Sequence, residues 1–145
     1  MSDKATYQDA DLILKLYEIR REEKMREARQ WFAGQFRASS MEEFGRACPP
    51  GSQESAYFRM VTSYWDMAGL FVAQGVLNEE LFVRSAGESL LVWEKVRPFI
   101  GELREAFSNP TYLENLEAVA EASVARMKES APGAYESFVS RVIGR

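Results

Sequence analysis

A nearly uninterrupted apolar stretch, Tyr57–Leu77, constrains the fold of this chain more than any other feature. Only Arg59, Asp66 and Gln74 within it are strongly polar. Such a stretch has to be buried, because each large apolar side chain removed from water contributes about 1.5–3 kcal/mol to folding. Ser52 at the start and Gly75 at the end have the residue types of helix caps and delimit a helix. We therefore predict a central apolar helix over residues 53–74 or so.

A second helix signal lies near the N-terminus, where apolar residues recur every three or four positions. It predicts one long helix over residues 9–36 or so. One face of this helix carries Leu14, Tyr17, Arg21, Met25, Ala28 and Phe32. We expect it to pack along the central helix through Leu14, Tyr17, Met25 and Phe32. A later helix, bent or divided at Pro98, is expected to contribute Leu90, Trp93, Val96, Phe99, Ile100 and Leu103 to the core.

Helical periodicity, caps and breaks account for the whole chain, and no strand-like alternation competes with them. We predict an all-α fold in which residues 1–145 form one domain. The expected architecture is an irregular bundle of five or six helices. A chain of 145 residues is long enough to bury a core without disulfides or metals.

Missing residue types narrow the range of functions. The chain has no histidine and one cysteine, Cys48, so histidine-based catalysis and Cys/His zinc sites are not expected. No cofactor or metal is predicted, and catalysis is left open but disfavoured. With one cysteine and no apolar leader at the N-terminus, a cytoplasmic location is expected.

The charges argue against nucleic acid and membrane partners. There are 22 acidic and 18 basic residues, a net charge of −4, which does not suit a phosphate backbone. Although the apolar stretch is long enough to cross a bilayer, Arg59 and Asp66 would each cost about 2.5–3.5 kcal/mol there. We expect no membrane span.

Asp66 is the most interesting polar residue of the central helix. Helical projection places it on one narrow stripe with Arg59, Thr62, Ser63 and Gln74, while the rest of the circumference is apolar. One interpretation is a carboxylate facing a ligand cleft. The other is a solvated stripe, or a carboxylate paired with an arginine of another helix.

The polar site that these alternatives share is formed by Arg21, Arg59, Tyr64, Trp65, Asp66 and Trp93. Arg21 stands on the apolar face of the first helix, and a buried guanidinium needs a carboxylate. We predict that Arg21 pairs with an acid of another helix, for which Asp66 is one candidate.

Two segments carry a resemblance to a known family. They are Tyr64-Trp65-Asp66 with its flanks, and the segment from Trp93 to Arg104, Trp-x-x-x-x-Pro-Phe-Ile-x-x-Leu-Arg. Together with Asp9–Glu23 and Asn109–Asn115, they resemble a bacterial all-helical family known only as a domain of unknown function. The resemblance implies a helical domain and supplies no catalytic residue.

These observations favour a non-enzymatic protein-interaction or oligomerisation module, either a homodimer or a domain that docks a partner. The long first helix and the lack of histidine chemistry motivate this hypothesis. The alternative is a small-ligand-binding protein, less readily an enzyme, with an aromatic pocket near Tyr64, Trp65 and Asp66. Bundles do place ligand sites between their helices.

Overall fold

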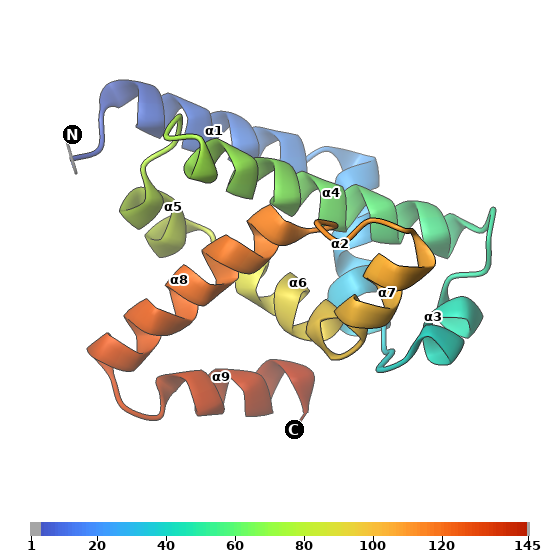
Figure 1. Ribbon diagram of the computed structural model, residues 1–145. Helices are drawn as coiled ribbons and strands as arrows, with labels where there is room; N and C mark the ends of the chain where they lie inside the picture. Colours follow the sequence, from blue (N-terminus) through green and yellow to red (C-terminus); the bar gives the residue numbers. More distant parts are fainter. Residues whose placement is uncertain (1–3, 145) are drawn as a thin grey trace.

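The computed structural model describes residues 4–144 and confirms the all-α class, with no strand in this range (Figure 1). Its helices are α1 (Tyr7–Arg20), α2 (Glu23–Gly34), α3 (Met41–Ala47), α4 (Gln53–Ala73), α5 (Glu79–Ser85), α6 (Glu88–Val96), the 3-10 turn η1 (Arg97–Phe99), α7 (Ile100–Ala106), α8 (Glu114–Ser130) and α9 (Ala134–Ile143). These are more helices than the five or six predicted, because breaks divide segments that the periodicity alone would join.

Helix α4 is the central helix, and its bounds agree with the prediction. The Ser52 hydroxyl accepts a hydrogen bond from the Ser55 amide at 3.1 Å and so caps its N-terminus. Its most extensive contacts are with α8 and α2. The apolar side chains that it buries most completely are Phe58, Val61, Trp65 and Ala68. The apolar stretch is thus buried by packing between helices.

The predicted N-terminal helix over residues 9–36 is wrong, because the chain breaks between α1 and α2. The Glu22 carboxylate accepts a hydrogen bond from the Met25 amide at 3.0 Å and begins a new helix. Across the break, Arg29 Nη1 donates to the carbonyl oxygen of Arg20 at 2.9 Å. Both new helix ends therefore have side-chain partners, which stabilises the break.

The break also changes which residues of α1 are buried. Leu14 and Tyr17 were predicted to face the core, but they are 59% and 46% exposed, whereas Leu16 is buried. On α2, by contrast, Met25, Ala28 and Phe32 are buried as predicted. The turn rotates α2 relative to α1, so residues with a continuous three- to four-residue spacing face solvent on α1 and the core on α2.

Helices α6 and α7 form the kinked segment, and Pro98 lies in the 3-10 turn between them. The predicted core residues here are all buried except Ile100, which is half-buried. Lys95 was not predicted to be buried. Its Nζ donates to the carbonyl oxygens of Phe32, Ala33 and Phe36 at 2.7–2.9 Å and thereby ties α6 to the C-terminus of α2.

Helix α8 runs from beside the central helix α4 down to α9, which lies along the far side of α6 from α4 (Figure 1). Helix α9 packs on α6 and α8, and the Tyr135 hydroxyl donates to Glu94 Oε2 at 2.7 Å. Glu94 is only 1% exposed. No helix within residues 4–144 combines the length and the apolar character needed to cross a bilayer.

Candidate functional site

The residues predicted to share one polar site lie on different sides of α4. Tyr64 and Trp65 face α1, α2 and α6, whereas Arg59 and Asp66 line a cleft on another side. Trp93 is 4% exposed and belongs to the core. The structure therefore does not bring these residues together into one aromatic pocket.

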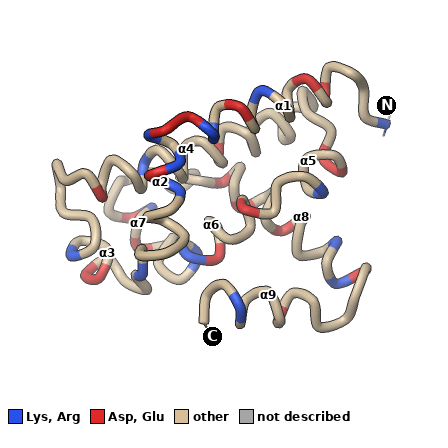
Figure 2. The backbone as a smooth tube through the Cα atoms, turned by 180° about the vertical axis from the view of Figure 1, so that it is seen from behind, with Lys and Arg blue, Asp and Glu red and all other residues tan. Residues whose placement is uncertain are grey.

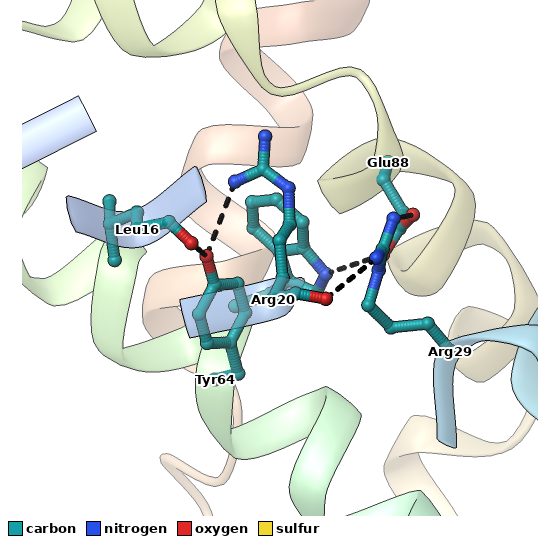
Figure 3. Close-up of polar contacts among 6 residues, drawn as sticks. Leu16, Arg20, Arg29, Tyr64 and Glu88 are labelled. Atoms are coloured by element: carbon teal, nitrogen blue, oxygen red, sulfur yellow. Dashed lines mark hydrogen bonds and ion pairs between the residues drawn. The ribbon is translucent and has the colours of Figure 1, made fainter. Parts of the chain in front are cut away.

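Tyr64 joins α4 to the end of α1 (Figure 3). Its hydroxyl donates a hydrogen bond to the carbonyl oxygen of Leu16 and accepts one from Arg20 Nη1 at 3.2 Å. Burial raises the pKa of the Tyr64 hydroxyl, while the nearby Arg20 guanidinium acts in the opposite direction. The phenol is neutral at physiological pH and holds the last turn of α1 in place.

Glu88 forms the ion pair of this region (Figure 3). Its two carboxylate oxygens accept from Arg29 Nε and Nη2, each at 2.8 Å, and Oε2 also accepts from Trp65 Nε1 at 3.2 Å. The bidentate geometry raises the pKa of the Arg29 guanidinium. Every partner is a helix residue, so this cluster links α2, α4 and α6.

The predicted ion pair of Arg21 with an acid of another helix does not form among the described residues. Arg21 is exposed, and its guanidinium lies over the ring of Tyr17, 5.5 Å from the centroid. Arg29 makes the interhelical pair instead. The physical reason is again the break between α1 and α2, because it is Arg29 on α2 that faces Glu88 of α6.

The Asp66 carboxylate is hydrogen-bonded to the N-terminus of α8. Its Oδ1 accepts from the amides of Asn115 and Leu116 at 3.1 and 2.9 Å, in the first turn of α8. Leu113, at the N-cap position of α8, has a left-handed backbone and makes no side-chain cap hydrogen bond. The Asp66 carboxylate thus caps α8 from a distance and complements the positive end of its dipole.

The approach of the two helices depends on Gly69. A Cβ atom at this position would lie 2.4 Å from the carbonyl oxygen of Asn115. Glycine is therefore required where the backbone of α8 reaches α4. Although Asn109-Pro110 has the pattern of a helix start, α8 begins at Glu114, where Asp66 can reach its amides.

Beside Asp66 the structure has a cleft of about 920 Å³ between α3, α4 and the segment joining α7 to α8. We call it the α4 cleft. Its apolar lining includes Phe44, Phe58, Met67, Leu70, Phe107 and Leu113. Its polar lining includes Ser55, Arg59, Thr62, Ser63, Asp66, Asn109, Thr111 and Tyr112. Apolar walls with a few converging polar groups are typical of small-molecule sites.

The segment that joins α7 to α8 forms one wall of this cleft. Ser108 and Leu113 both have left-handed backbones, with φ of 51° and 60°, which non-glycine residues adopt at a cost. Arg104 Nε holds the segment by donating to the carbonyl oxygen of Tyr112 at 2.8 Å. Burial raises the pKa of the Tyr112 hydroxyl, and its hydrogen bond with the Thr62 side chain acts in the opposite direction. The wall is thus anchored in a strained conformation.

Cys48 also lines the α4 cleft, but its thiol is poorly suited to nucleophilic chemistry. It is 3% exposed, and burial, with a smaller contribution from Glu54, raises its pKa to about 11. The thiolate is the reactive form of cysteine. At physiological pH this thiol is protonated and unreactive.

A second concave surface lies between the α1–α2 corner and α4. This surface, which we call the methionine groove, has a volume of about 800 Å³. It is lined by Glu18, Ile19, Glu22, Met25, Met60, Ser63, Tyr64 and Met67. Figure 2 shows acidic and basic residues interspersed along α1 and α2. The charges that line the groove itself are both acidic.

Sequence reasoning missed the most connected polar residues. Arg29 and Glu88 lie in helices whose periodicity does not distinguish them from solvated charges, and their pairing spans 59 residues of sequence. Tyr112 follows Asn109-Pro110, which resembles a helix start and hides its role in the cleft wall. No spacing in the sequence therefore marks these residues as paired.

Fold and sites together define an all-helical domain with two concave surfaces on its central helix. Over residues 5–123 the chain matches the profile of a family described as a domain of unknown function, DUF4760. The chain belongs to this family, and the resemblance found in its sequence is confirmed. No curated protein and no solved structure matches it.

Proposed function

We propose that this domain is a non-enzymatic protein-interaction module that docks a partner's amphipathic helix in the methionine groove. The observation that carries the proposal is the apolar, accessible floor of the groove. Ile19 is 50% exposed and Met67 is 38% exposed, beside the half-buried Met60 and the buried Met25. Unbranched methionines adapt to different apolar surfaces, which suits a helix-binding groove.

Charge indicates what kind of helix fits. Glu18 and Glu22 are the charged residues that line the groove, so the preferred partner carries lysine or arginine beside its apolar face. The chain's own net charge of −4 makes a second copy a less complementary occupant. The expected ligand is therefore a basic amphipathic helix of another protein.

The test uses two designed 18-residue peptides, each with a leucine face and with either lysines or glutamates on the other face. Fluorescence anisotropy of the labelled peptides measures binding to the full chain at low and high salt. We expect the lysine peptide to bind, the glutamate peptide to bind at least tenfold more weakly, and salt to reduce the difference. Equal binding of both, or none, would refute the proposal.

Matched variants locate the binding. Ile19→Ser removes an apolar contact in the groove, while Leu14→Ser makes the same kind of change at an exposed position of α1 outside the groove. Only Ile19→Ser should weaken the lysine peptide. Light scattering provides a second readout, because it measures whether the 16.5 kDa chain is a dimer. A dimer that Ile19→Ser dissociates would show that the groove binds a second copy of the chain and would contradict the proposed partner helix.

A further inference from the structure

We propose that the α4 cleft is a separate binding site for a small amphipathic anion, a molecule with an apolar chain or ring and one anionic head bound by Arg59. The cleft adjoins the methionine groove, with which it shares Ser63 and Met67, but this proposal does not depend on the function of that groove. The cleft's volume of about 920 Å³ falls within the range of small-molecule sites. Its walls supply the apolar part of the site, and its polar groups are concentrated on α4 and Tyr112.

Arg59 is the group that selects an anion. It is exposed on α4 and lines the cleft, and its guanidinium makes no hydrogen bond or ion pair with another described residue. By contrast, Arg29 and Arg104 are held by Glu88 and Glu117 at 2.8 and 2.9 Å. A guanidinium binds carboxylate and phosphate oxygens with paired N–H donors, so Arg59 can supply both charge and geometry.

Asp66 does not cancel this preference. It lies seven residues beyond Arg59 on the same helix, which corresponds to a rise of about 10 Å. Its Oδ1 is already engaged by the amides of Asn115 and Leu116 at the positive end of α8. The anionic head is thus placed at the Arg59 end of the cleft.

The apolar part of the ligand has its own contacts. Leu70 and Phe107 line the cleft with 41% and 48% of their surfaces exposed, although large apolar side chains are usually better covered. Phe44 and Phe58 pack edge to face with centroids 4.8 Å apart and form an aromatic wall. A chain or ring covering these side chains would remove them from water.

The probes are decanoate, decyl phosphate and the neutral decanol, each titrated below its aggregation concentration into the full chain by calorimetry. We expect at least one anion to bind at least tenfold more tightly than decanol. Decanoate as the tighter ligand indicates a carboxylate head, and decyl phosphate indicates a phosphate head. Equal binding of decanol and both anions, or no binding, would overturn the proposal.

Variants separate head from chain. Arg59→Gln should weaken the bound anion at least tenfold and leave decanol unchanged, because it removes charge-assisted hydrogen bonds. Arg84→Gln, an exposed arginine on α5 away from the cleft, is the control. An unchanged anion affinity in Arg59→Gln, with the fold intact by circular dichroism, would refute the assignment of Arg59.

Three variants test where the apolar chain of the ligand binds and whether this binding is independent of the methionine groove. Leu70→Ser should weaken the binding of all three probes. Val76→Ser replaces another exposed apolar residue, which lies outside the cleft, and should weaken the binding of none. Ile19→Ser should abolish peptide docking without changing anion binding. Loss of anion binding in Ile19→Ser would show that the two sites are one and contradict the proposal.

Discussion

Asp66→Ala tests the idea that a carboxylate on the central helix caps α8 through the tertiary structure. The variant removes the acceptor that the amides of Asn115 and Leu116 reach at 3.1 and 2.9 Å. Loss of a helix cap costs about 1–2 kcal/mol, and loss of the negative charge at a helix N-terminus about 0.5–1 kcal/mol. Alanine recovers about 0.5 kcal/mol through its higher helix propensity in α4.

The expected net loss for Asp66→Ala is therefore about 1–2.5 kcal/mol in the free energy of unfolding. For a chain of this size that corresponds to a fall in Tm of about 3–10 °C. Asp66→Asn keeps an acceptor oxygen and loses only the charge, so it should cost about 0.5–1 kcal/mol. Urea denaturation followed by circular dichroism, together with thermal melts, measures both values.

Hydrogen exchange localises the effect. In Asp66→Ala the amides of Asn115 and Leu116 should exchange faster, since their acceptor is gone. Glu121→Ala removes an exposed acid from the same helix α8 and should change stability by less than about 0.5 kcal/mol. A loss below about 0.5 kcal/mol in Asp66→Ala, or unchanged exchange at both amides, would refute the capping role.

Three other variants or measurements test further contacts. Gly69→Ala should destabilise the chain by about 1–3 kcal/mol in urea denaturation, because its Cβ would meet the Asn115 carbonyl oxygen at 2.4 Å, whereas Gly101→Ala, with open space around it, should be neutral or stabilising. Glu88→Ala should cost about 1–3 kcal/mol by leaving Arg29 without its carboxylate, and a coupling energy near zero in a double-mutant cycle with Arg29→Ala would contradict that. Cys48, with its pKa raised to about 11, should react slowly with iodoacetamide at pH 7.4 and much faster in urea, and a rate equal to that of the unfolded chain would show that the thiol is accessible.

Local patterns predicted the central helix well. The bounds of α4 follow from its apolar run and from Ser52, whose capping hydrogen bond is formed as expected. The core residues on either side of Pro98 were predicted as well, because periodicity within one helix decides which face is buried. These features depend on neighbours in the sequence and need no knowledge of other helices.

The break at Glu22 could not be predicted in this way. A glutamate in a charge-rich run looks like a helix-forming residue. Here it caps α2, and across the break Arg29, from the next turn of α2, donates to the carbonyl oxygen of Arg20. Because of this break, Leu14 and Tyr17 are exposed, and no local pattern in the sequence predicts that.

By itself, the sequence determined the all-α class, the central position of residues 53–73 and most of the core, since apolar burial and helix periodicity are local properties. Tertiary structure alone decided what its polar residues do. Asp66 became a cap for α8 because Gly69 lets that helix approach, and Arg59 lies at the cleft with no ion-pair partner among the described residues. The partner of a charged side chain depends on how helices distant in the sequence pack together, and the spacing of residues along one helix does not predict that packing.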